Sequence, residues 1–152
     1  MITKPIPYGR QHITDEDIQC VIDALKSDYL TQGPKIKEFE EAFASYVGCK
    51  YAIAVNNATA ALHLAATALD VNPGDKVIVT PLTFAASANC IRYRGGEVVF
   101  CDVEEDTYLM DIKKLSRLLS QSPKGTYKGI VLVDFAGYPA NLEAFRQLAD
   151  EY

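Results

Sequence analysis

The stretch Val55-Asn56-Asn57-Ala58-Thr59-Ala60-Ala61-Leu62 joins two segments of different character. The apolar run Tyr51–Val55 is typical of a buried strand, and the alanine-rich segment after it is typical of a helix. Asn57–Thr59 is therefore expected at a helix N-terminus, where unpaired backbone N–H groups and the helix dipole favour a phosphate. The small Ala58 would let an anion approach, and Thr59 would add a hydroxyl donor. The alternative is an ordinary asparagine N-cap on a core helix.

Length and composition predict one sizeable core. The chain has 152 residues, of which 49% are hydrophobic. The net charge is -5, and Lys and Arg form no basic stripe, which argues against nucleic acid as the main partner. No apolar run approaches the ~20 residues that span a bilayer. Because Met1–Pro5 also lacks the apolar core of a signal peptide, we expect a cytoplasmic protein.

The cysteines lie singly within apolar patterns. None belongs to a C-x-x-C pair, and neither His12 nor His63 is near a cysteine in sequence. We therefore expect small buried thiols and no metal site. The cysteines are Cys20, Cys49, Cys90 and Cys101.

From residue 51 onward, apolar runs alternate with helix-length segments. Strands are expected at Tyr51–Val55, Lys76–Thr80, Glu97–Cys101 and Gly129–Val133. Helices are expected at Ala58–Leu69, Phe84–Tyr93, Asp111–Ser120 and Asn141–Glu151. This order is typical of an α/β fold with a mainly parallel sheet and helices on both faces. Ligands gather at the carboxyl ends of such strands, where Asn56–Thr59, Thr80–Phe84 and Asp134–Tyr138 fall.

Two helices are expected before the sheet. Thr14 and Asp17 form a capping box for the first helix, and Gly33-Pro34 opens the second, which ends at Gly48. Their apolar stripes are expected to face inward, and consist of Ile18, Val21, Ile22 and Leu25 in the first helix and Ile36, Phe39, Phe43 and Val47 in the second. The chain is thus expected to divide into an N-terminal helical segment, residues 1–50, and an α/β part, residues 51–152.

Common catalytic fingerprints do not accompany these strands. The sequence contains no G-x-G-x-x-G, no G-x-x-x-x-G-K-[ST] and no G-x-S-x-G motif. His63 lies within a helix and is expected to be a packed or surface residue. Phe84 follows a strand at its carboxyl end, where an aromatic ring could stack on a flat cofactor. The alternative is a core phenylalanine that opens a helix.

Several ordered blocks resemble the sugar aminotransferases of the DegT/DnrJ/EryC1/StrS family. They are Leu30–Pro34, Phe39–Phe43, Asn57–Ala65, Pro73–Asp75, Thr80–Asn89, Phe100–Val103 and Asp111. The resemblance runs in register over essentially the whole chain. Within the family, Thr80–Asn89 and Val133–Gly137 are most similar to the transaminases of pseudaminic acid synthesis.

The resemblance implies the N-terminal portion of a fold type I large domain that binds pyridoxal 5'-phosphate and works as a homodimer. By position, Ala58 and Thr59 would hold the cofactor phosphate, and Phe84 would stack on the pyridine ring. The amino group would pass from L-glutamate to the C4 keto group of a UDP-linked deoxysugar. The implied substrate-contacting residues are Tyr8, Asp28, Tyr29, Leu30, Thr31 and Ala58, of which Leu30 and Thr31 match the family in identity and Asp28 and Tyr29 in position only.

Family members run to more than twice this length. The acid that pairs with the pyridine nitrogen and the lysine that bonds to the cofactor would lie beyond Tyr152, so we expect no catalytic residue before that point. Three hypotheses follow. The parent is a nucleotide-sugar aminotransferase, or it is a sugar dehydratase of the same family in which histidine replaces that lysine, or these residues form a binding module without catalysis.

Overall fold

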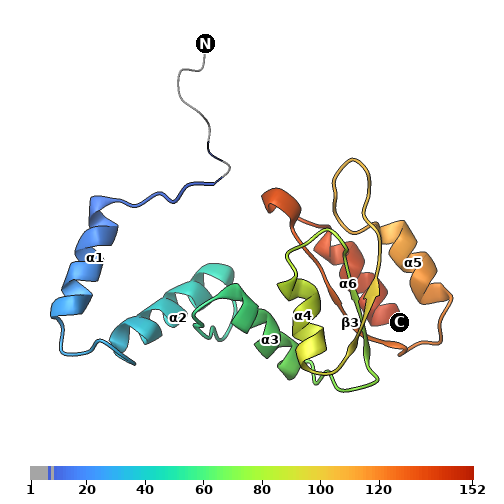
Figure 1. Cartoon of the computed structure of the whole chain (residues 1–152), viewed down its shortest axis with the longest axis horizontal. Coiled ribbons are helices and arrows are strands. Elements are labelled where there is room, and N and C mark those ends of the chain that lie inside the picture. The colour runs from blue at the N-terminus through green and yellow to red at the C-terminus, as the bar shows by residue number, and fades with distance from the viewer. Residues whose placement is uncertain (1–6, 8) are drawn as a thin grey trace, which may run out of the picture. The chain divides into compact units, whose positions relative to one another are not determined.

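The computed structural model describes residue 7 and residues 9–152, and the chain divides into two compact units, Met1–Ala54 and Val55–Tyr152. The described part of the first unit contains two helices, α1 (Asp15–Lys26) and α2 (Pro34–Val47) (Figure 1). The second unit contains a sheet and the remaining helices.

The ends of α1 and α2 confirm the local sequence signals. The Thr14 hydroxyl accepts a hydrogen bond from the Asp17 N–H at 3.2 Å, and the Asp17 carboxylate accepts one from the Thr14 N–H at 2.7 Å. These reciprocal bonds form the predicted capping box. Pro34 begins α2, which ends at Gly48 with a left-handed φ of 71°.

The predicted inward direction of the two apolar stripes is wrong. Seven of their side chains are 45% to 65% exposed, and Ala44 is the one buried residue of the two helices. Two helices and their loops offer too little apolar surface to bury both stripes within this unit. The seven are Ile18, Val21, Leu25, Ile36, Phe39, Phe43 and Val47.

The predicted strand Tyr51–Val55 is also wrong. These residues are outside any strand, and Tyr51 and Ile53 are 74% and 78% exposed. A strand requires a partner for its backbone hydrogen bonds, and none of the described strands pairs with this segment. The Ala54 N–H instead donates to the Glu40 carboxylate at 2.8 Å.

The sheet of the second unit is parallel, as predicted. It comprises β1 (Lys76–Val79), β2 (Glu97–Phe100) and β3 (Tyr127–Val131) in the order β2-β1-β3. Val79 lies opposite Phe100 on one side and Val131 on the other. The strand predicted at residues 129–133 therefore begins and ends two residues earlier in the structure.

Four α-helices surround this sheet, with a short 3-10 helix after β3. They are α3 (Ala58–Ala68), α4 (Ala86–Tyr93), α5 (Ile112–Ser120), η1 (Phe135–Gly137) and α6 (Leu142–Glu151). Each α-helix begins within two residues of its predicted start, and the largest difference is at α4, which begins after Phe84 and Ala85.

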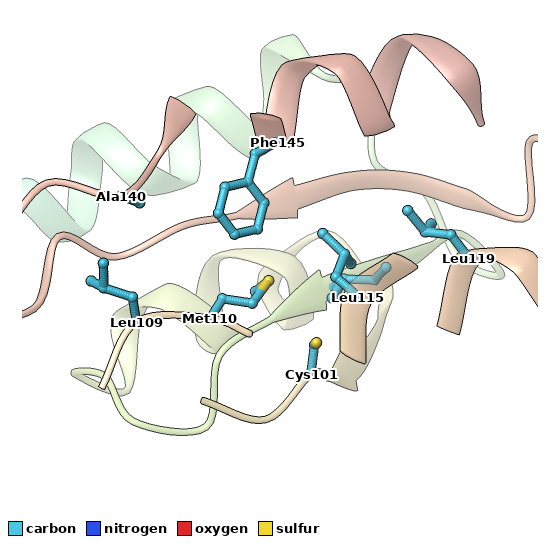
Figure 2. Packing of buried hydrophobic residues seen from close by; sticks show 8 residues of the cluster. Cys101, Leu109, Met110, Leu115, Leu119, Ala140 and Phe145 are labelled. Atoms are coloured by element: carbon cyan, nitrogen blue, oxygen red, sulfur yellow. The ribbon is translucent and has the colours of Figure 1, made fainter. Parts of the chain in front are cut away.

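Alternating residues of β1 carry the core to both faces of the sheet. Ile78 is fully buried against α5 and α6, in a cluster that includes Leu115 and Phe145 (Figure 2). Val77 and Val79 are fully buried on the other face, against α3 and α4. Helices therefore cover both faces, as the sequence predicts.

The prediction of buried thiols holds for two of the four cysteines. Cys90 and Cys101 are buried, whereas Cys20 and Cys49 are exposed in the first unit, whose described residues form no hydrophobic core cluster. Burial raises the pKa of both inner thiols, that of Cys101 to about 11. Both inner thiols therefore remain neutral at physiological pH.

Candidate functional site

The N-terminus of α3 combines an asparagine cap with unused donors. Asn57 has an extended backbone, and its side-chain oxygen accepts a hydrogen bond from the Ala60 N–H at 2.8 Å. Its carbonyl accepts the first helical bond, from the Ala61 N–H at 3.2 Å. Within the described hydrogen bonds, the Ala58 and Thr59 N–H groups donate to no protein acceptor. The ordinary cap is therefore present, and it leaves two donors for a ligand.

The surroundings of these two donors suit an anion. Ala58 is exposed and Thr59 is half-buried, so neither residue is enclosed by the protein. The first turn of α3 contains no acidic residue, unlike that of α1, which contains three. The positive end of the α3 dipole is thus left without an acidic side chain in its own first turn.

Phe84 presents its ring to solvent at the carboxyl end of β1. The side chain is 78% exposed, so the alternative of a core phenylalanine is wrong. Its loop is held by the buried Thr80, whose hydroxyl accepts from the Leu82 N–H at 3.4 Å, and by the Thr83 hydroxyl, 2.8 Å from that of Ser87. These bonds fix the loop and leave the aromatic face available.

The fold brings α3 and Phe84 to the same side of the sheet. Helices α3 and α4 pack against each other, and α3 leads down to the amino end of β1. Its N-terminus therefore points toward the carboxyl end of β1, where Phe84 precedes α4. Ala58, Thr59 and Phe84 thus belong to one unit and one edge, which is the arrangement expected for a ligand site in a parallel sheet.

The other predicted substrate contacts belong to the first unit. Asp28–Thr31 lies in the bend between α1 and α2, with Tyr29 64% and Leu30 70% exposed. The Ser27 hydroxyl accepts from the Tyr29 N–H at 3.3 Å and shapes this bend. Tyr8 lies outside the described residues.

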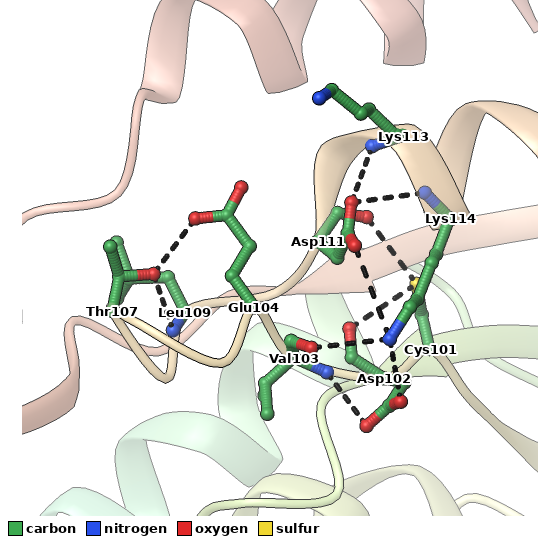
Figure 3. Close-up of polar contacts among 9 residues, drawn as sticks. All are labelled: Cys101, Asp102, Val103, Glu104, Thr107, Leu109, Asp111, Lys113 and Lys114. Carbon is green, nitrogen blue, oxygen red and sulfur yellow. Dashed lines mark hydrogen bonds and ion pairs between the residues drawn. The ribbon is translucent and has the colours of Figure 1, made fainter.

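The loop after β2 is fastened by an ion pair (Figure 3). Lys114 Nζ donates to Asp102 at 2.7 Å and to the Val103 carbonyl at 3.3 Å, and Asp111 caps α5. The hydrogen bond from Lys114 lowers the pKa of Asp102, and the same bond raises the pKa of Lys114. The Asp102 carboxylate is therefore already paired with the ammonium group of Lys114.

The loop after β3 contains a second carboxylate. Asp134 accepts a hydrogen bond from the Ala140 N–H at 2.9 Å, and its carbonyl accepts one from the Gly137 N–H at 3.0 Å. Ala136 has a left-handed φ of 53°. The loop follows a strand at its carboxyl end, where the sequence predicts ligands to gather, but no sequence signal gives Asp134 a role.

The described part of the chain contains neither a metal-binding cluster nor a membrane-spanning helix. No three His, Cys, Asp or Glu side chains there are grouped to hold a metal ion. None of its helices has the length and apolar character required to cross a bilayer.

Comparisons with known proteins identify the family. Residues 11–152 match the profile of the DegT/DnrJ/EryC1/StrS aminotransferase family. The chain therefore belongs to this family, whose members are pyridoxal-phosphate-dependent aminotransferases.

Individual relatives share sequence and fold with the chain. The UDP-4-amino-4,6-dideoxy-N-acetyl-beta-L-altrosamine transaminase of Campylobacter jejuni is 41% identical over 97% of this chain and 38% of its own length. The candidate sugar aminotransferase Spr1654 of Streptococcus pneumoniae, in its PLP form, superposes with a TM-score of 0.86 at 35% identity, over 96% of this chain and 36% of its own. Helicobacter pylori PseC, an aminotransferase of pseudoaminic acid biosynthesis, has a TM-score of 0.84 at 30% identity, over 97% of this chain and 39% of its own.

Proposed function

We propose that the chain is part of a nucleotide-sugar aminotransferase and that the N-terminus of α3 holds the phosphate of pyridoxal 5'-phosphate. The observation that carries the proposal is the pair of N–H groups of Ala58 and Thr59, which have no protein acceptor within the described hydrogen bonds. A phosphate oxygen is the ligand that such donors favour. The proposal that this phosphate belongs to pyridoxal 5'-phosphate is supported by the chain's membership in a family of pyridoxal-phosphate-dependent enzymes.

The described residues fit this cofactor in three ways. Ala58 has a side chain small enough for a phosphate to reach the backbone, and Thr59 adds a hydroxyl donor. Phe84 offers an exposed ring to a flat pyridine. When bound, pyridoxal phosphate supplies the electron sink through which an amino group moves between two substrates. The role of these three residues is to bind and orient it.

The proposed substrate is a UDP-linked deoxysugar with a keto group at C4, and the proposed donor is L-glutamate. The support comes from relatives that act in such chemistry, the altrosamine transaminase and the pseudoaminic acid aminotransferase. Tyr8 and Asp28–Thr31, with Ala58, are the proposed sugar contacts. We propose that the whole enzyme is a cytoplasmic homodimer.

A single-tryptophan variant tests cofactor binding directly. The chain contains no tryptophan, so Phe84→Trp places a unique fluorophore where the ring is proposed to stack. The titrant is pyridoxamine 5'-phosphate, which has no aldehyde to react with surface lysines. We expect saturable quenching that inorganic phosphate competes away, and weaker binding of pyridoxamine without its phosphate.

The control is Tyr93→Trp, at the last residue of α4, the helix that Phe84 precedes. Tyr93 is 56% exposed, so its variant reports non-specific association equally well. Quenching of equal size and affinity at both positions, or no saturable quenching at position 84, would refute the proposed site.

A further inference from the structure

Asp134 stands at the same edge of the sheet as the proposed cofactor site. It lies three residues beyond Val131, which is paired with Val79, while Phe84 lies five residues beyond Val79. Neighbouring parallel strands deliver the residues that follow them to one edge. Figure 1 shows the loops after β1 and β3 leaving the sheet at that same end.

Only one of the two oxygens of the Asp134 carboxylate accepts a hydrogen bond among those described. One oxygen, Oδ1, accepts the Ala140 N–H at 2.9 Å. Among the described hydrogen bonds and ion pairs, none involves Oδ2 or joins Asp134 to a cation. Asp102, at the end of β2, differs because Lys114 Nζ lies 2.7 Å from it. Asp134 is exposed, so Oδ2 is an acceptor that is open to solvent and has no partner among the described protein groups.

The turn that follows Asp134 contains an alanine in a strained backbone conformation. Ala136 has φ 53° and ψ 25°, in a region that costs an L-residue about 1–2 kcal/mol. Hydrogen bonds from the Gly137 N–H to the Asp134 carbonyl and from the Tyr138 N–H to the Phe135 carbonyl hold the turn, both at 3.0 Å. Strain of this kind is retained where it places a functional group.

We propose that Asp134 is a positioning residue, whose Oδ2 accepts a hydrogen bond from a hydroxyl or N–H donor of the ligand bound at this edge. The proposal rests on the proposed function, because it requires a ligand beside Phe84. The Ala140 N–H fixes the carboxylate by Oδ1, so Oδ2 meets the ligand without losing side-chain freedom. The donor belongs to the pyridoxal ring or to the sugar, and the titrations below separate these two sources.

Asp134→Asn tests the proposal by the sign of its effect. The variant keeps an oxygen for the Ala140 N–H but loses the negative charge. General electrostatics would make any Asp→Asn change strengthen the binding of an anionic phosphate ligand. The control Asp106→Asn makes the same charge change at an exposed turn residue. Calorimetric titration with pyridoxamine 5'-phosphate and with UDP-N-acetylglucosamine compares the three chains.

We expect Asp134→Asn to weaken one ligand about ten-fold or more, the size of a hydrogen bond to a charged group, while Asp106→Asn weakens neither. Loss with pyridoxamine phosphate assigns the donor to the ring, and loss with the UDP-sugar assigns it to the sugar. Thermal unfolding should be unchanged in Asp134→Asn and lowered in Asp134→Ala, which loses the bond from Ala140. If Asp134→Asn binds both ligands as tightly as Asp106→Asn does, the inference is wrong, although the proposed function stands. If the unaltered chain binds neither ligand, the proposed function fails first.

Discussion

Replacing Ala58 by proline removes one proposed phosphate donor with little other change. Ala58 is the first residue of α3, a position where proline is favoured because its N–H has no helical acceptor. Asn57 has ψ 162°, within the extended region that a residue before proline prefers. The chain already uses this arrangement at α2, which begins with Pro34. We therefore expect the fold to be retained.

The expected loss is one hydrogen bond to a charged group. Such bonds contribute about 1.5–3 kcal/mol, which corresponds to roughly ten- to a hundred-fold in affinity. The dissociation constant of pyridoxamine 5'-phosphate, measured by calorimetry, should rise by that factor in Ala58→Pro. The free energy of unfolding should change by less than about 1 kcal/mol, because proline mainly restricts the unfolded chain.

The matched control is Asp15→Pro, at the first residue of α1. Thr14 before it is extended as well, with ψ 166°, so the backbone requirement is the same. Because this variant also removes a negative charge, it should bind the anionic ligand at least as tightly as the unaltered chain does. Unchanged affinity in Ala58→Pro, with a normal unfolding transition, would refute the reasoning that backbone donors of α3 hold the phosphate.

Three further predictions concern thiols, packing and association. Iodoacetamide at pH 8 should modify the exposed Cys20 and spare the buried Cys101 until the chain unfolds, as measured by mass spectrometry. Burial raises the pKa of the Cys101 thiol from 9.0 to about 11. The contribution of the neutral thiol to the free energy of unfolding should therefore be fully present below pH 9.0 and be lost as the pH rises through 11. Gly96→Ala places a Cβ 2.7 Å and 2.8 Å from two core side chains and should lower the free energy of unfolding by about 1–3 kcal/mol in denaturant titration. The chain should associate through its exposed apolar helices in light scattering, and the double variant Phe39→Glu, Phe43→Glu should scatter less; equal scattering would contradict this.

Local signals in the sequence predicted most of the second unit. Runs of Val and Ile marked β1 to β3, and helix-length segments between them fixed a parallel order. These elements find their partners within the described chain, so local pattern and tertiary packing agree. Tyr51–Val55 has the same apolar character, yet no described strand pairs with it. A strand is defined by its partner, which a local pattern cannot supply.

The site was predictable to a similar extent. Asn57 at the junction of an apolar run and an alanine-rich segment was sufficient to locate a helix N-terminus. The exposure of Phe84 was undecided in the sequence, because an aromatic residue before a helix is equally compatible with a core position. The hydrogen bond from the Ala140 N–H to Asp134 could not be predicted, since it joins residues six apart across a turn. Gly137 is a sequence signal for a left-handed residue in this turn, but nothing in the sequence indicates that Ala136 before it is left-handed as well.

The helices of this chain differ in how their first turns are used. Four are capped by a side chain, and three of these caps come with a carboxylate: acids follow the caps of α1 and α6, and Asp111 itself caps α5. An acid there stabilises a helix by about 0.3–1 kcal/mol. Of the four helices with a side-chain cap, α3 lacks this contribution, since its cap is the neutral Asn57 and its first turn contains no acid. The first turns of α2 and α4, which have no side-chain cap, contain no acid either. A sequence feature that lowers helix stability is expected at functional sites. A phosphate bound at the N-terminus of α3 would supply the negative charge that the first turn lacks.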